Sequence, residues 1–247
     1  MAASRERQLW DYADAGDKDA VAREIVENKT PLEYKNPDAD LNTPLLQSVW
    51  NGHLPVVEIL VNAGAQVEAR NKRDDTPLIL AAVEGILPVV QYLVKEARAS
   101  VDAKGEFDGT ALYWAAWKGH LNVTRYLVED AKANVRVTTK VGDTPLILAA
   151  CCGHLAVVQW LVEEGGADVN HRGEKNKTAA EWAVARGKTE VSGWLGGFVT
   201  DMKKVHTHTH THTHTHDRTH TCIHLATMRL SKKDKYSTKK KISSTMG

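Results

Sequence analysis

Apolar and polar residues follow a helical period along most of this chain. Apolar runs at 56–61, 89–94 and 157–162 are interrupted by polar residues at helical spacing. Each run is preceded by a thinner apolar segment, and three of these segments hold paired alanines at 81–82, 115–116 and 149–150. Because apolar residues three and four apart share one face of a helix, the pattern predicts pairs of short amphipathic helices.

The same short motif returns at a nearly constant interval. It recurs after 33 residues and then three times after 34, as Thr43-Pro44-Leu45, Thr76-Pro77-Leu78, Thr110-Ala111-Leu112, Thr144-Pro145-Leu146 and Thr178-Ala179-Ala180. A glycine follows each Thr by nine residues, at Gly52, Gly85, Gly119, Gly153 and Gly187. A period of this length marks a stack of structural repeats.

The residue types explain how each unit folds. A Thr hydroxyl accepts from the free N–H groups of a first helical turn, and a following Pro suits the first helical position. Glycine fits the left-handed position that ends a helix, so the chain reverses into a second helix. Polar segments such as 71–75 and 105–109 favour tight turns and are expected to project as fingers. A hairpin of this kind buries its apolar face only by stacking on neighbours.

These residues resemble the ankyrin repeat, whose pattern is Thr-Pro-Leu-His-x-Ala-Ala-x-x-Gly-His-Leu followed by an apolar helix and Gly-Ala-Asp-x-Asn. The best copies are residues 144–170 and 43–67. The resemblance covers roughly residues 7 to 198 and implies an all-α solenoid of stacked helix-turn-helix hairpins with β-turn fingers.

The predicted organisation has caps at both ends of the repeats. A degenerate N-terminal capping repeat is expected at 7–42, where Arg7 replaces the Thr, and a degenerate C-terminal cap at 178–198, where Gly193, Gly196 and Gly197 weaken the last helix. The full repeats are 43–75, 76–109, 110–143 and 144–177, and a disordered His-Thr and Lys-rich tail is expected at 199–247.

Two departures from the family pattern matter. The family's His is replaced by Leu46, Ile79, Tyr113, Ile147 and Glu181, so apolar packing has to substitute for the Thr–His hydrogen bond. Two repeats also place Arg98 and Lys132 where Gly64 stands in the first full repeat. Because a left-handed conformation disfavours residues other than glycine, we expect those helices to continue slightly further.

The resemblance implies binding through the fingers and the inner helices. The matching finger residues are Lys72, Arg73, Asp75, Glu106, Phe107, Gly109, Lys140, Val141, Asp143, Glu174, Lys175 and Lys177. The matching helix residues are Trp50, Asn51, Val83, Glu84, Trp117, Lys118, Cys151, Cys152 and Arg186. Tryptophan is enriched in binding hot spots, so Trp50 and Trp117 stand out, together with Phe107. The alternative is that these aromatics pack within the stack, as we expect of Trp114, Trp160 and Trp182.

Composition and charge narrow the class of protein. The net charge of +1 combines a mildly acidic body with a tail, 201–247, that has ten Lys/Arg against three Asp/Glu. A body of this kind does not favour nucleic acid as the partner. The charged start and the lack of a long apolar stretch predict neither secretion nor membrane insertion. The three cysteines do not have the number or spacing of a disulfide framework. We expect a cytoplasmic monomer, with the basic run 232–241 compatible with nuclear entry.

No recognisable catalytic pattern is present in the sequence. Cys152 and His154 could form a thiol and its base, but His53 and His120 occupy the same slot without a neighbouring cysteine. We therefore interpret His154 as structural and expect no enzyme activity, cofactor or small-molecule substrate.

The tail has an unusual composition. His and Thr alternate from His206 to His216, and His220 and His224 follow. Imidazoles in this pattern could bind Zn or Ni. A translated CA dinucleotide repeat, or a disordered tail without a selected function, would give the same alternating sequence. Two functional hypotheses follow: a non-catalytic scaffold that binds a protein on its concave face, or a metal-binding or basic tethering role for the tail.

Overall fold

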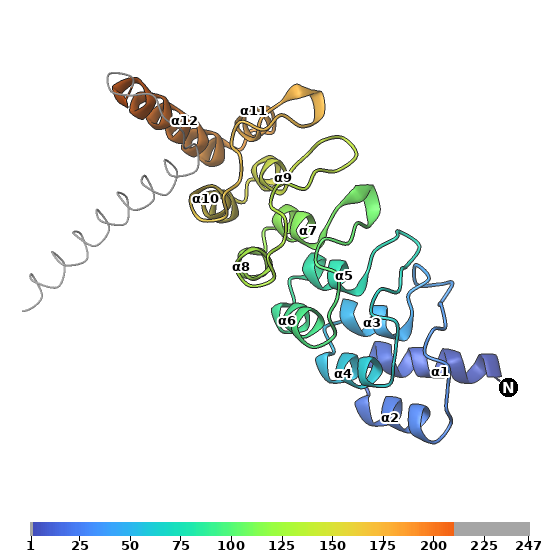
Figure 1. The fold of residues 1–247 in the computed structure, drawn as a ribbon. Coiled ribbons are helices and arrows are strands. Elements are labelled where there is room, and N and C mark those ends of the chain that lie inside the picture. The colour runs from blue at the N-terminus through green and yellow to red at the C-terminus, as the bar shows by residue number, and fades with distance from the viewer. Residues whose placement is uncertain (1, 210–247) are drawn as a thin grey trace, which may run out of the picture.

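Helices fill most of the part of the chain that the structure describes. The computed structural model describes residues 2–209 (Figure 1). Its α-helices are α1 (Ala2–Ala15), α2 (Lys18–Val26), α3 (Pro44–Trp50), α4 (Leu54–Asn62), α5 (Pro77–Glu84), α6 (Leu87–Lys95), α7 (Ala111–Lys118), α8 (Leu121–Glu129), α9 (Pro145–Cys152), α10 (Leu155–Glu163), α11 (Ala179–Ala185) and α12 (Thr189–Thr209). Two 3-10 turns, η1 (Glu106–Asp108) and η2 (Glu174–Asn176), lie in fingers, and the only β-pairing within 2–209 is one bridge between Asn36 and Asn42.

The helices form two layers. Odd-numbered inner helices, from α1 to α11, contact one another in succession, and even-numbered outer helices, from α2 to α12, do the same. The finger loops project on the side of the inner layer (Figure 1). The predicted all-α solenoid of stacked hairpins is therefore confirmed.

The predicted helix starts are confirmed at each repeated Thr. The side-chain oxygen accepts from the backbone N–H three residues later at Thr43, Thr76, Thr110, Thr144 and Thr178. At the last of these, the Glu181 carboxylate also accepts from the Thr178 N–H at 2.8 Å, which completes a reciprocal capping box. Local side-chain chemistry thus fixes where every inner helix from α3 to α11 begins.

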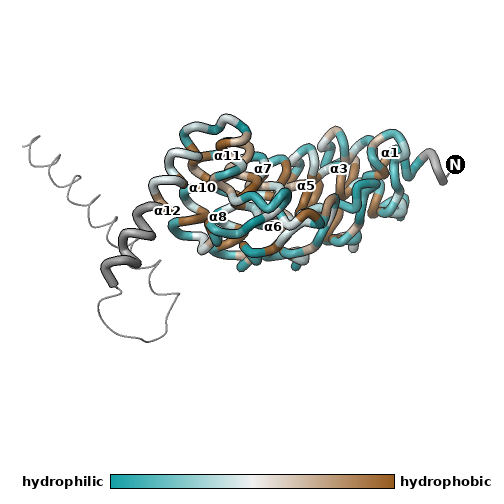
Figure 2. Tube along the Cα trace, turned by 90° about the horizontal axis from the view of Figure 1, so that it is seen from above, coloured by the Kyte–Doolittle hydropathy of each residue, from teal (hydrophilic) through white to brown (hydrophobic). Residues whose placement is uncertain are grey.

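Apolar packing replaces the missing family histidine in four of the five slots, whereas the fifth residue, Glu181, is exposed and takes part in the capping box instead. Leu46, Ile79 and Ile147 are almost completely buried, and Tyr113 is half-buried. They belong to an apolar core that continues from repeat to repeat, and Figure 2 shows apolar segments recurring along the stack. Each repeat therefore completes the core of its neighbour.

Arg98 and Lys132 correct the expectation that their helices continue further. Both residues adopt left-handed backbone with φ of 59°, and α6 and α8 end before them. The next residues, Ala99 and Ala133, are buried, and their N–H groups donate to Leu93 and Leu127 at 2.9 and 2.8 Å. The left-handed turn is needed to bury the alanine and to form this hydrogen bond, so it occurs even where its residue is not glycine.

Helix α12 extends past the boundary expected at residue 198. It passes through the three glycines expected to weaken it and ends at Thr209. Residues 199–209, placed in the tail by the sequence analysis, are thus helical. Residues 210–247 lie outside the described part, and with them most of the His-Thr segment and the lysine run, so the predictions about disorder and metal binding in the tail stay predictions.

Candidate functional site

The fingers and inner helices together form one surface, here called the inner face. A groove of about 400 Å³ lies on it. Its lining comes from the fingers through Asp40, Asn71, Arg73, Asp75 and Glu106, and from the inner helices through Gln47, Trp50, Leu80, Val83, Trp114, Trp117 and Lys118. Charged finger residues thus face apolar and aromatic helix residues, an arrangement suited to an extended chain with both kinds of side chain.

Two of the predicted aromatic residues are partly open to solvent in this groove. Trp50 and Trp117 are 39% and 37% exposed. Trp117 also packs edge-on against the buried Trp114, with ring centroids 5.1 Å apart, and the Lys118 Nζ lies 5.0 Å from its ring centroid. Trp117 therefore packs against the stack while part of it stays exposed, and its role in binding stays a prediction.

Phe107 lies at the tip of the finger that contains η1. Its backbone is left-handed, with φ of 58°, and its side chain is 59% exposed. A left-handed conformation costs a non-glycine residue free energy, so the surrounding turn, and not Phe107 itself, imposes this backbone conformation. The expected alternative, packing of Phe107 within the stack, does not occur.

Asp75 is a correction to the set of predicted contact residues. It is buried, and its Oδ1 accepts from the Glu106 N–H of the next finger at 3.1 Å. Asp143 repeats the arrangement two repeats later and accepts from the Glu174 N–H at 2.9 Å. Burial raises the pKa of both carboxyls above the usual value, although these N–H groups act in the opposite direction. Both aspartates therefore hold neighbouring fingers together.

The other two finger junctions use backbone groups. The Lys72 N–H donates to the Asp40 carbonyl at 2.7 Å, and the Lys140 N–H donates to the Phe107 carbonyl at 3.3 Å. The Arg73 guanidinium adds an ion pair with Asp40 at 2.8 Å. Successive junctions thus alternate between a backbone bond and an aspartate bond.

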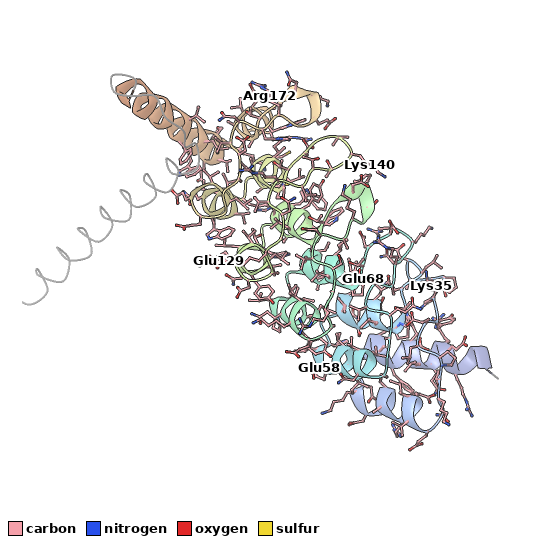
Figure 3. All side chains as sticks on the ribbon, in the orientation of Figure 1. Lys35, Glu58, Glu68, Glu129, Lys140 and Arg172 are labelled. Atoms are coloured by element: carbon pink, nitrogen blue, oxygen red, sulfur yellow. The ribbon has the colours of Figure 1, made fainter. Side chains whose placement is uncertain are left out.

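The remaining predicted residues lie on the inner face with different degrees of exposure. Exposed are Asn51, Lys72, Arg73, Glu84, Lys118, Lys140, Val141 and Lys175, whereas Val83, Glu106, Asp143, Cys151, Cys152 and Glu174 are half-buried. The Asn51 amide donates to the Asp14 carboxylate at 2.9 Å, so part of its capacity is used within the stack. In Figure 3, Lys140 and Arg172 lie at the fingers, while Glu58 and Glu129 lie at the outer helices.

Cys152 and His154 do not form a nucleophile and base. The His154 Nε2 lies 2.9 Å from the Trp117 carbonyl oxygen and is engaged there. Burial raises the pKa of the Cys152 thiol, followed in size by the effect of Cys151. A raised thiol pKa lowers the fraction of thiolate at neutral pH, the opposite of what a nucleophile needs.

The three histidines of this slot join successive repeats. His53 Nε2 lies 3.0 Å from the Asp14 carbonyl oxygen, and His120 Nε2 lies 2.9 Å from that of Val83, as His154 does with Trp117. Each ring also lies against a left-handed glycine of the preceding repeat, at Gly16, Gly85 and Gly119, where an added Cβ would approach the ring to between 2.5 and 2.9 Å. The structural role expected for these histidines is confirmed.

Several residues that line the groove were not predicted from the sequence. Asp40, Asn42 and Gln47 contribute to it from the N-terminal side. Asp40 precedes Thr43 by the same interval as Arg73 precedes Thr76, so aligning the finger of the N-terminal cap with the others would have found it. Asn42 and Gln47 bond to each other at 2.9 Å, a contact with no sequence pattern behind it.

The described residues contain neither a membrane-spanning helix nor a cluster of metal-binding side chains. Between residues 2 and 209, no helix combines the length and the apolar character needed to cross a membrane. In the same part of the chain, no three His, Cys, Asp or Glu residues are grouped so that they could hold a metal ion.

Sequence comparisons identify relatives for the repeats. A family model described as ankyrin repeats in three copies matches residues 66–139, and a single-repeat model matches 40–72 and 141–174. The mouse protein phosphatase 1 regulatory subunit 27 is 31% identical over 84 residues, which are 34% of this chain and 53% of that protein. A probable E3 ubiquitin-protein ligase of Oryza sativa subsp. japonica, XBOS33, is 38% identical over 81 residues, 32% of this chain and 16% of that protein.

The curated relatives support the repeat assignment more firmly than any whole-protein activity. The matched segments cover about half of one relative and a small part of the other, so ligase activity is not carried over to this chain. The family models, in contrast, together match more than half of the chain, and the structure has the corresponding stack of hairpins. The chain belongs to the ankyrin-repeat family.

Proposed function

We propose that this chain is a non-catalytic scaffold that holds a protein partner on its inner face. Ankyrin repeats are protein-interaction repeats, and one matched relative is named a regulatory subunit. The observation that carries the proposal is the groove in which Trp50 and Trp117, both more than one-third exposed, lie opposite charged finger residues. Tryptophan in a groove with a polar rim is the usual composition of a binding hot spot.

The geometry also favours binding with little loss of entropy. The inner helices are held by their Thr caps, and the fingers are held by hydrogen bonds between neighbours. A surface ordered before binding loses less conformational entropy when a partner docks. A rigid groove of this kind suits a defined partner better than a promiscuous one.

The proposal is tested by partner capture with matched variants of the full chain. The wild type, Trp50→Ala/Trp117→Ala and a control, Glu58→Ala/Glu129→Ala on the outer helices, are immobilised and exposed to the same lysate, and captured proteins are identified by mass spectrometry. We expect the tryptophan variant to lose partners that the wild type and the control retain, with unchanged far-UV circular dichroism.

A second arm separates the inner face from the tail. Capture is repeated with a chelator present, which would release partners held through metal on the histidine segment. If the double tryptophan variant still captures the same partners and the chelator releases them, the inner face is not the binding surface and the proposal is wrong.

A further inference from the structure

Three cationic side chains gather around one tryptophan at the C-terminal end of the inner face. Lys175 Nζ and Lys177 Nζ lie 5.6 and 4.8 Å from the centroid of the Trp182 ring, and Arg186 Cζ lies 5.6 Å from it. Because all three lie within 5.6 Å of one point, no two of them are further apart than twice that distance. These separations are comparable to the Debye length in physiological salt, so the charges are only partly screened and repel one another.

Little within the stack neutralises this cluster. Lys175 has an ion pair with Glu174 at 3.7 Å, but among residues 2–209 no carboxylate pairs with Lys177 or Arg186. The nearby Glu181 carboxylate is occupied by Arg172 at 3.0 Å and by the Thr178 N–H. Trp182 is buried, and its ring offers the cations a cation–π contact, which does not cancel their charge.

A further cation lies on the same surface, two inner helices away. Lys118 Nζ lies 5.0 Å from the Trp117 centroid, and among the described residues no carboxylate pairs with it. The inner helix between the two sites is α9, whose last residue, Cys152, is affected by the charges of Lys188 and Arg186 and by the Trp117 side chain. The inner face thus has a cationic site at each end of this stretch and the uncharged, half-buried Cys151 and Cys152 between them.

The separation of the two sites suits a short extended peptide. Helices α7, α9 and α11 pack in succession, and packed helices lie about 8–10 Å apart, so the sites are roughly 16–20 Å apart. An extended chain advances about 3.3 Å per residue, so about five or six residues span that distance.

We propose that this part of the inner face binds an extended acidic segment of a protein partner. Carboxylates at one end contact Lys118, carboxylates at the other end contact Lys177 and Arg186, and an apolar residue between them lies against Cys151 and Cys152. The inference rests on the proposed scaffold function and names the chemistry of the partner. A nucleic acid fits less well because its backbone carries charge at every nucleotide, whereas Cys151 and Cys152 between the two sites are uncharged and the exposed Glu84 lies on the same face.

The test uses the full chain and a labelled probe peptide, Glu-Glu-Gly-Leu-Leu-Gly-Glu-Glu, in fluorescence anisotropy at moderate salt. An exposed ion pair contributes at most about fivefold in affinity, so we expect Lys177→Ala/Arg186→Ala, which removes two such pairs, to weaken binding by roughly two- to twenty-fivefold. The matched control is Lys95→Ala/Arg125→Ala, because Lys95 also lies over an aromatic ring, Tyr126, but on the outer helices. This control should bind as the wild type does, and circular dichroism checks that both variants fold.

Three outcomes would overturn the inference. One is no binding of the probe, another is equal binding by both double variants, and the third is tighter binding of a single-stranded oligonucleotide that is lost in Lys177→Ala/Arg186→Ala. Failure here is distinguishable from failure of the scaffold function, since partner capture that depends on Trp50 in the N-terminal half of the groove can persist when the acidic probe does not bind.

Discussion

Replacing Gly119 by Ala tests how closely successive repeats must approach. Gly119 ends α7 at φ of 82°, and a Cβ added there would lie 2.5 Å from Nδ1 of His154 in the next repeat. The methyl group therefore meets two obstacles: a left-handed backbone, which costs roughly 1 kcal/mol, and the histidine ring. Displacing the ring also breaks the hydrogen bond between His154 Nε2 and the Trp117 carbonyl, which lies at 2.9 Å.

The expected cost follows from these parts. Losing the hydrogen bond removes about 1 kcal/mol, and forcing a methyl group into a packed contact costs about 1–3 kcal/mol. With the backbone cost of roughly 1 kcal/mol, Gly119→Ala should lower the free energy of unfolding by about 3–5 kcal/mol. Such a change is a large fraction of the stability of an ordinary domain.

The chain contains matched glycines for this experiment. Gly64 has φ of 95° and no atom within 4 Å of an added Cβ, so Gly64→Ala carries the backbone cost alone. Gly153 is intermediate, because its added Cβ would meet the flexible Lys188 side chain at 2.8 Å, and that side chain can move. We expect the order of destabilisation to be Gly119, then Gly153, then Gly64.

Urea denaturation, followed by circular dichroism and tryptophan fluorescence, measures the series. Because a repeat array need not unfold in one step, the two signals should be fitted together with a nearest-neighbour model. The decisive comparison adds His154→Ala, after which Gly119→Ala should cost no more than Gly64→Ala. If Gly119→Ala costs about 1 kcal/mol in both backgrounds, the ring moves aside freely and the contact does not hold the repeats together.

Two further predictions concern backbone strain and buried charge. Lys132→Gly relieves a left-handed backbone with φ of 59° and should raise the free energy of unfolding by about 0.5–1 kcal/mol in urea denaturation, whereas an unchanged or lowered stability would contradict the strain. The second prediction compares the wild type with Asp75→Asn/Asp143→Asn. In the wild type, burial raises the folded pKa of both carboxyls above the ordinary value of 3.8, so the native state binds protons at higher pH than the unfolded state does. The wild type should therefore gain stability relative to the variant as pH falls from neutral through the folded pKa, and should gain no more below 3.8; parallel stability–pH curves would refute this.

The sequence predicted the features that depend on local chemistry. Each Thr cap is set by one side chain and the next turn of helix, so its position could be inferred from the motif alone. The burial of Leu46 and Ile147 could be inferred because their repeat slots recur with apolar residues. Features of this kind repeat with the sequence period, and the period made them visible.

Features that depend on contacts between repeats were not predictable in the same way. The turn at Arg98 is imposed by the burial of Ala99 and by the hydrogen bond from its N–H to Leu93. The conformational preference of Arg98 alone, on which the prediction was based, does not include these contacts. Asp75 looked like a surface residue because it is the last residue of a polar finger, but its partner is an N–H group in the next finger. Groove residues such as Arg73 and Lys118 were inferred from their repeat slots, whereas Gln47 lines the groove without a repeat pattern that indicates it.

The alternating bonds between fingers imply that the exchangeable module of this chain contains two repeats. Each finger aspartate needs a glycine opposite it, since a Cβ at Gly105 or Gly173 would collide with the carboxylate of Asp75 or Asp143. In the intervening finger, Gly109 stands where the aspartate would be, and no such requirement arises. Duplicating residues 43–109 or 110–177 as a block would keep the two kinds of junction alternating, whereas duplicating one repeat would place two like fingers side by side and break the alternation. An array lengthened in steps of two should therefore keep its fingers in register, and one lengthened by a single repeat should not.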